Sequence, residues 1–176
     1  MKCLHHLSII ALVSLLNASP GFAFGKSSSV SSGLTPVTLP ESAIASSSLK
    51  IAQLNQRVNQ VQSRLNRASE AAIRNGLRKT HDDSLGYMGN GVDSNTTLTL
   101  RQGVSYLIVG VCDDSCQNLQ IRLYDENGNL VVSDTRNTSV PIVRITPRWT
   151  GRFRINTTMA RCASAPCHYG LAAFGQ

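Results

Sequence analysis

Four cysteines in the last third of the chain form two closely spaced pairs, Cys112 with Cys116 and Cys162 with Cys167. Thiols at such spacings can bind zinc, cycle as a redox dithiol or oxidise to disulfides. A redox pair typically has the spacing Cys-x-x-Cys in a thioredoxin-like context, and this sequence has neither. We expect two disulfides, with a metal site as the alternative. Of the three connectivities, we favour Cys112–Cys116 and Cys162–Cys167, because each bond then closes one loop.

Acidic residues near these loops suggest one cofactor, a calcium ion. Carboxylate oxygens suit Ca²⁺, and they could form a site if the loops converge. The residues concerned are Asp113, Asp114, Asp125 and Asp134. The favoured alternative is that Asp125 and Asp134 cap turns, as aspartate commonly does. No other cofactor is predicted.

Histidine chemistry gives little support for an enzyme. After residue 23 the chain contains His81 and His168 alone. Serine is abundant, but the sequence has no Gly-x-Ser-x-Gly nucleophile elbow. His168 follows Cys167 directly at the start of an expected strand, so we expect a structural role. The sequence predicts a protein that is not an enzyme.

Aromatic and basic residues could form a face that binds carbohydrate or protein. Strand alternation turns Tyr124 outward together with Arg122, and Trp149 lies in a turn close to Arg152. Tyrosine, tryptophan and arginine are enriched where proteins recognise ligands. Alternatively, Trp149 folds over one end of the core.

The N-terminus has the organisation of an export signal. A weakly basic start precedes the apolar run Leu7 to Leu16, and small residues at Gly21 and Ala23 suit cleavage. We expect residues 1–23 to be removed, leaving a secreted or periplasmic chain, which suits disulfides. Residues 24–39 are rich in serine and predict a flexible tether.

Residues 40–80 predict a basic amphipathic helix with a heptad repeat. Apolar residues alternate at spacings of three and four, the pattern of a short coiled coil: Ile44, Ile51, Leu54, Val58, Val61, Leu65, Ala68 and Ala72. We favour a parallel homo-oligomer through this stripe. The alternative is that the helix packs against its own domain.

Positive charge is concentrated on this helix. The chain carries a net charge of +7, while arginines and carboxylates balance beyond residue 80. Four cations occupy g positions of the heptad: Lys50, Arg57, Arg64 and Arg78. A parallel pair sets them against neutral e positions, whereas an antiparallel pair sets g against g. These four cations could contact an anionic lipid or polymer, or they could simply be solvated. Export makes nucleic acid an unsuitable partner.

Residues 84–176 predict an antiparallel β-sandwich. The hydrophobic period changes to two near Asn95, and about seven short strands alternate with turn signals such as Asn127-Gly128. The run from Val104 to Cys112 is apolar throughout and predicts a strand buried on both faces. Aromatic residues are only 5% of the chain, so valine, isoleucine and leucine must fill the core.

The order of motifs resembles the bacterial pre-peptidase C-terminal domain over residues 95–175. The matching segments are Leu-x-x-Gly-x-x-Tyr from Leu100 to Tyr106, the run Tyr124 to Asp134, and Thr150 to Ile155. This resemblance implies a jelly-roll-like sandwich, a fold that is usually appended to secreted enzymes. Family members often carry Asp-x-Asp-Leu where this chain has Asn118-Leu-Gln-Ile. The departure weakens any transfer of a cation site.

Taken together, the sequence predicts a mainly β, non-enzymatic binding or accessory module that is exported. Its partner would be a protein or glycan in the envelope or outside the cell. The alternative is an envelope-surface protein whose basic helix docks anionic polymer or lipid, and an enzyme is a distant third.

Overall fold

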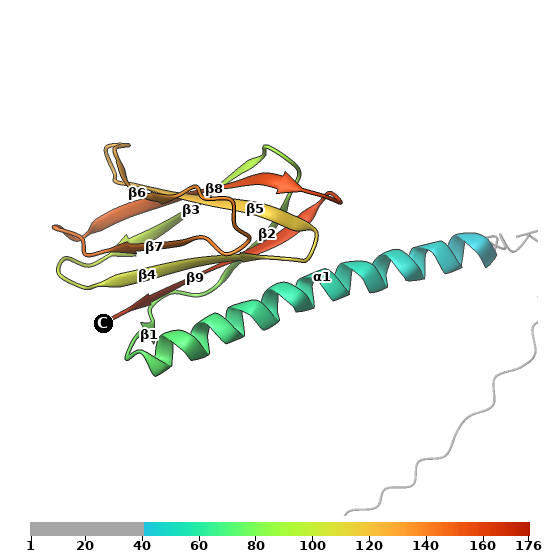
Figure 1. Ribbon diagram of the computed structural model, residues 1–176, viewed down its shortest axis with the longest axis horizontal. Coiled ribbons are helices and arrows are strands. Elements are labelled where there is room, and N and C mark those ends of the chain that lie inside the picture. Colours follow the sequence, from blue (N-terminus) through green and yellow to red (C-terminus); the bar gives the residue numbers. More distant parts are fainter. Residues whose placement is uncertain (1–40) are drawn as a thin grey trace, which may run out of the picture. The chain divides into compact units, whose positions relative to one another are not determined.

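The computed structural model describes the backbone of residues 41–176 and the side chains from residue 46 (Figure 1). The predicted signal and tether, residues 1–23 and 24–39, lie outside the described residues. Within the described part, no helix has the length and apolar character needed to cross a bilayer. Its elements are α1 (Glu41–Arg74), β1 (Arg78–Lys79), β2 (Ser84–Met88), β3 (Asp93–Leu100), β4 (Tyr106–Cys112), β5 (Cys116–Tyr124), β6 (Leu130–Asp134), β7 (Ile142–Ile145), β8 (Gly151–Cys162) and β9 (Cys167–Gly175).

The strands form two antiparallel sheets. One has the order β1-β9-β4-β7, with β2 also pairing with β9, and the other has the order β3-β8-β5-β6. We call them the five-stranded and the four-stranded sheet. The predicted fold class, a mainly antiparallel β-sandwich preceded by one helix, is confirmed.

The main core lies between the sheets and follows the predicted alternation. On β5, Leu119, Ile121 and Leu123 are all fully buried, while the residues between them are partly exposed. Phe153 and Ile155 on β8 face the same core. β4 is buried along nearly its whole length, as predicted, and β9 is buried at every position. A strand buried on both faces needs cover from two sides.

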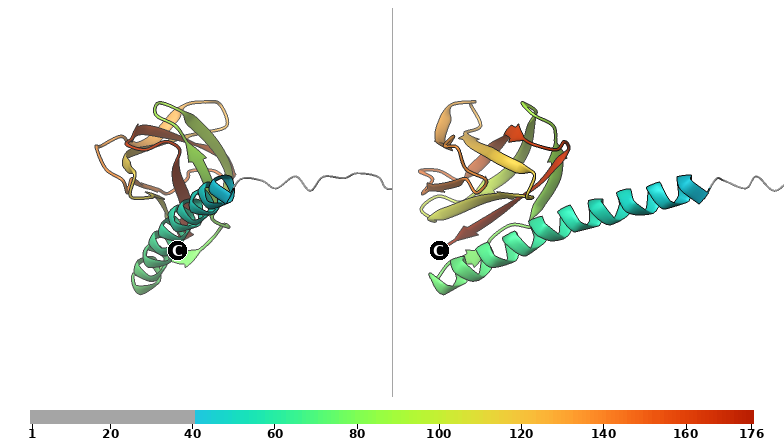
Figure 2. Two further views of the ribbon diagram at one scale, coloured as in Figure 1. Left: turned by 90° about the vertical axis from the view of Figure 1, so that its right-hand side faces the viewer. Right: turned by 45° about the vertical axis from the view of Figure 1, so that its right-hand side comes forward.

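The second cover is the C-terminal half of α1, which packs on the outer face of the five-stranded sheet (Figures 1 and 2). Val61 and Leu65 are buried there against a cluster that contains Phe174. Each such side chain contributes about 1.5–3 kcal/mol by leaving water. The alternative of packing in cis therefore holds for this half of the heptad stripe.

Gly170 on β9 allows the helix to approach the sheet closely. A Cβ atom at Gly170 would lie 2.7 Å from Leu65 Cδ1 and 2.9 Å from Val61 Cγ1. Separations this short do not occur between real side chains, so any larger residue would push the helix away.

The helix ends six residues earlier than the predicted boundary at residue 80. Gly76 adopts a φ of 78°, which a side chain disfavours. The Leu77 N–H donates to the Ala72 carbonyl at 3.1 Å, and the Gly76 N–H donates to that of Ile73 at 3.0 Å. This pair of bonds is a Schellman cap, which terminates the helix and frees the chain to form β1.

Strand β2 was not predicted from the sequence. It pairs with β9 from Ser84↔Leu171 to Met88↔Cys167, and it turns Leu85 and Tyr87 toward solvent. Gly86 at its centre conceals the strand signal, yet it is required because a Cβ there would lie 2.7 Å from the Tyr169 ring.

Candidate functional site

The outer face of the four-stranded sheet is the first candidate site. The helix packs on the other sheet, so this face remains open (Figure 2). Register and alternation place polar side chains side by side on its three long strands. We call this set the arginine face: Asn95 on β3, Arg152, Arg154, Asn156 and Thr158 on β8, and Gln120, Arg122 and Tyr124 on β5.

Neutral groups hold two of the three arginines of this face in position. Arg122 donates to Thr158 Oγ1 at 3.1 Å and to Gln120 Oε1 at 3.0 Å. Arg154 donates to Asn95 Oδ1 at 3.1 Å, which also accepts from Asn156 Nδ2 at 3.3 Å. Because these partners carry no charge, the guanidinium groups are ordered without being neutralised. Such groups are suited to bidentate binding of carboxylate, sulfate or phosphate.

The structure brings together three of the four predicted ligand-binding residues. Tyr124 lies opposite Arg154, whose guanidinium carbon stacks 4.4 Å from the centre of the tyrosine ring. Trp149 lies elsewhere, because its ring stacks on buried Phe153 with centroids 5.9 Å apart. It therefore covers the core, as the alternative interpretation had it, although 38% of the residue stays exposed. Arg154, which the sequence also places near Trp149, lies on the same face, because alternation along β8 turns it outward together with Arg152.

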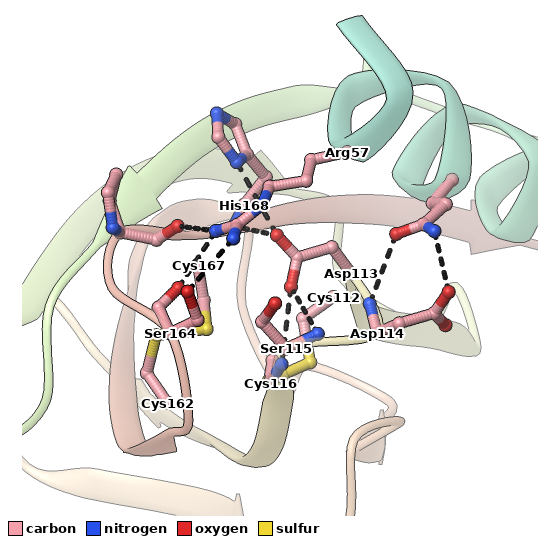
Figure 3. Close-up of polar contacts among 12 residues, drawn as sticks. Arg57, Cys112, Asp113, Asp114, Ser115, Cys116, Cys162, Ser164, Cys167 and His168 are labelled. Atoms are coloured by element: carbon pink, nitrogen blue, oxygen red, sulfur yellow. Dashed lines mark hydrogen bonds and ion pairs between the residues drawn. A yellow bond between two sulfur atoms is a disulfide. The ribbon is translucent and has the colours of Figure 1, made fainter. Parts of the chain in front are cut away.

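Both predicted disulfides are present. Cys112–Cys116 joins the end of β4 to the start of β5, and Cys162–Cys167 joins β8 to β9. Each bond closes a very short loop, and closure of such a loop contributes only about 2 kcal/mol through chain entropy. Their main effect is to fix the shape of two loops that lie next to α1 (Figure 3).

Three helix residues on one face hold these loops. Arg57 donates to the carbonyl oxygens of Ser164 at 2.8 Å and Pro166 at 2.6 Å. Gln60 exchanges two hydrogen bonds with Asp114, and Arg64 contacts both Asp114 and the Cys112 carbonyl. We call these contacts the helix clamp; Figure 3 shows those that Arg57 makes. The spacing of three and four residues places all three side chains on the same side of the helix.

The helix clamp changes the interpretation of the four g-position cations. Arg57 and Arg64 contact the sandwich of their own chain. Lys50 and Arg78 remain exposed. The two clamp residues are therefore poorly placed to contact an anionic surface, whereas the two exposed residues are accessible.

Asp113 organises the first disulfide loop. Its carboxylate is fully buried and accepts from the N–H groups of Ser115, Cys116 and His168 at 2.9, 3.2 and 2.8 Å. His168 Nδ1 lies 3.4 Å from the same carboxylate. The Asp113 oxygens thus hold backbone groups of both disulfide loops, and the predicted structural role of His168 agrees with this arrangement.

The remaining predicted metal ligands cap turns. Asp125 accepts from the backbone N–H groups of Asn127 and Asn129, and the hydrogen bond from the Asn129 side chain holds the Asp125 pKa below its ordinary value. Asp134 forms a bidentate pair with Arg136, which lowers the Asp134 pKa strongly. Across residues 46–176, no three acidic, histidine or cysteine side chains are grouped as metal ligands.

Comparisons with known proteins give similarity to solved structures only. No family model matches the chain, and no curated protein matches it. Among 13 matching solved chains is the periplasmic inhibitor of g-type lysozyme from Aeromonas hydrophila. It is 13% identical with a TM-score of 0.41, and the match covers 54% of this chain and 85% of that one.

Another match is the pre-peptidase C-terminal domain of the collagenase from Bacillus anthracis, the family that the sequence motifs resemble. It is 12% identical with a TM-score of 0.41, and the match covers 52% of this chain and 87% of that one. Similarities of this strength give no information about the function of this chain.

Proposed function

We propose that this protein is an exported, non-enzymatic binding module whose arginine face binds an acidic polysaccharide in the periplasm or outside the cell. The observation that carries the proposal is the set of ordered guanidinium groups with neutral partners on the one sheet face that the helix leaves open. The two disulfides support an oxidising compartment.

The composition of the face favours an acidic glycan over a protein partner. Beside its three arginines, the face offers amide and hydroxyl groups from Asn95, Asn156, Gln120 and Thr158, which suit sugar hydroxyls. Protein interfaces usually have an apolar core, and Tyr124 is the single aromatic residue among the members of the arginine face. On the outward positions of β3, β8 and β5, the one carboxylate is that of Asp93 at the end of the face.

The same chemistry supports a binding role rather than catalysis. Guanidinium, amide and hydroxyl groups orient a ligand well, but none of them is a general base near neutral pH. The face therefore has the groups needed for recognition without those needed for proton transfer.

The test is a glycan and protein array followed by calorimetry with the selected ligand. Arg122→Gln and Arg154→Gln should each weaken binding of a uronate- or sulfate-bearing polysaccharide by about 10-fold or more, since each removes a charged hydrogen-bonding group. Arg74→Gln is the matched control, because it removes the same charge from an exposed helix position. Rising salt should weaken binding of the wild type more than that of either face variant.

The second candidate function is docking of the basic helix on an anionic lipid or polymer. It is favoured by exposed Lys50, Arg67, Arg74 and Arg78 on the helix and the segment after it. Vesicles that contain anionic lipid distinguish the two. If Arg74→Gln and Arg78→Gln abolish binding while Arg122→Gln and Arg154→Gln do not, the helix is the binding element and the arginine-face proposal is wrong.

A further inference from the structure

The apolar stripe of α1 continues beyond the part that packs on the sandwich. Leu65 and Val61 are 0% and 2% exposed, but Val58, Leu54 and Ile51 are 39%, 49% and 59% exposed. The N-terminal half of the helix extends past the sheets (Figure 1). The heptad spacing is unbroken between the two halves, so the exposed residues continue an interface that is already in use.

Strand β2 forms the other wall of an apolar groove at this position. Leu85 and Tyr87 are 51% and 70% exposed on its outer face. Together with Leu54 and Val58 they line a groove of about 380 Å³, whose floor contains Tyr169. Contiguous exposed apolar surface of this kind marks a contact with a partner. We call it the stripe groove.

We propose that a second copy of this chain covers the stripe groove by antiparallel pairing of the projecting helix halves. The heptad pattern makes the stripe complementary to itself. Residues 46–61 carry only two charges, Lys50 and Arg57, and Arg57 donates to carbonyl oxygens of its own second disulfide loop. The e positions beside the stripe are the neutral amides Asn55 and Gln62. An antiparallel pair sets the g-position cation Lys50 toward Arg57 of the second copy, and the contacts of Arg57 with its own sandwich reduce that repulsion.

The position of the sandwich determines the direction of pairing. It lies over the stripe from Val61 onward. In a parallel pair, both sandwiches would need the same space between the helices. The stripe rotates by only about 20° per heptad, which is too little to move a sandwich aside. An antiparallel pair places the two sandwiches at opposite ends, which replaces the parallel arrangement expected from the sequence.

Antiparallel pairing allows registers that differ by one heptad, and we place the helices in the one that sets Ile51 opposite Leu54. An a position meets a d position of the other copy, so Ile51 lies against Leu54 of the second copy and Val58 lies against Ser47. The first turns of the second helix then approach Leu85 and Tyr87, which fills the stripe groove. The short seam predicts a dimer that dissociates in the micromolar range rather than an obligate one.

The oligomeric state of the exported chain is measured by sedimentation velocity across a concentration series. The wild type should form a concentration-dependent dimer, and Val58→Asp should weaken it at least 100-fold because it buries an unpaired charge. Leu49→Asp is the control. Leu49 is 66% exposed on the same part of the helix but lies off the stripe, so this variant should still dimerise. The proposal is overturned if the wild type stays monomeric at several hundred micromolar. This conclusion holds even if the monomer binds phosphatidylcholine vesicles.

Disulfide cross-linking tests the direction of pairing. If residues 1–23 are removed as predicted, Cys3 is lost and the four remaining native cysteines are in disulfides, so an added cysteine reports only on the new contact. A mixture of Ser47→Cys and Val58→Cys chains should give mainly the mixed dimer under mild oxidation. If each variant instead cross-links mainly to another copy of itself, the helices pair in parallel and the proposal is contradicted. Neither measurement depends on the arginine face.

Discussion

The Arg57 guanidinium on α1 donates to the Ser164 carbonyl oxygen, 2.8 Å away in the second disulfide loop. The same nitrogen donates to the Pro166 carbonyl at 2.6 Å, and the second nitrogen reaches Ser164 Oγ at 3.1 Å. The helix therefore contacts the loop through backbone carbonyl groups, and the Cys162–Cys167 disulfide holds these carbonyl groups in position. The Cys162–Cys167 disulfide and the helix clamp act as one unit that fixes α1 to the sandwich.

Replacing Arg57 should weaken this attachment. Arg57→Gln removes three hydrogen bonds from a partly exposed charged group, so we expect unfolding to become easier by about 1–2 kcal/mol. Urea denaturation followed by circular dichroism measures this change. Arg74→Gln alters the same residue type at an exposed position and should change stability by less than about 0.5 kcal/mol. Equal stabilities of the Arg57 and Arg74 variants would show that the clamp contributes nothing.

Gly170→Ala tests the close approach of α1 to β9. The added methyl group would lie 2.7 Å from Leu65 Cδ1, so we expect a loss of about 1–3 kcal/mol from overpacking. Gly89→Ala is the control, since its Cβ would meet only Val92 at 3.9 Å. Adding Leu65→Ala to Gly170→Ala should cost less than the sum of the two single changes, because they affect the same space. Additive costs in thermal melts would contradict direct contact.

Much of the sandwich could be predicted because its signals are local. Alternation on β5 placed Leu119, Ile121 and Leu123 in the core, and the tight spacing of the cysteines gave the disulfide pairing. Strand β2 could not be predicted, because Gly86 interrupts its pattern and the need for glycine arises from Tyr169, far away in sequence.

The surface against which the heptad stripe packs could not be predicted from the sequence either. The same apolar spacing suits a second helix or the wall of a sheet, since both bury one stripe. Val61 and Leu65 pack on the sheet because Gly170 on β9 leaves room for them. The sequence of the helix alone does not indicate that β9 has a glycine at this point. The arginine face was found in part, because alternation shows which residues share a face but not which neutral partners hold them.

Removal of the helix should destabilise the sandwich. A chain that starts at Ser84 would expose the outer face of β4 and β9, including Val109, Val111 and Phe174, which are now at most 4% exposed. We expect such a chain to aggregate or to melt without cooperativity, as judged by calorimetry and light scattering. Leu65→Ala in the full chain is a milder change than removal of the helix and should lower the free energy of unfolding by about 2–5 kcal/mol. A truncated chain that melts as cooperatively as the full one would show that the helix is not part of the core.

Asp134 should make folding sensitive to acid. It sits at the end of β6, where its carboxylate pairs with Arg136 and accepts from the Ile142 N–H at 2.9 Å, so it links the two sheets. The Arg136 hydrogen bond lowers the Asp134 pKa below its ordinary value of 3.8. A lowered pKa means that the ionised group stabilises the fold above the ordinary value, and that this contribution disappears as pH falls toward the folded-state pKa.

Asp134→Asn should therefore cost about 1–3 kcal/mol at about pH 6, because the amide cannot replace both carboxylate oxygens as acceptors. The difference between wild type and variant should shrink steadily as the pH is lowered from about 5 toward about 2, since the wild type then loses its charge as well. Urea denaturation at a series of pH values measures this difference. Asp82→Asn is a control at an exposed aspartate and should leave the acid dependence of the wild type in place. A difference that stays constant over this range would show that the Asp134 charge does not stabilise the fold.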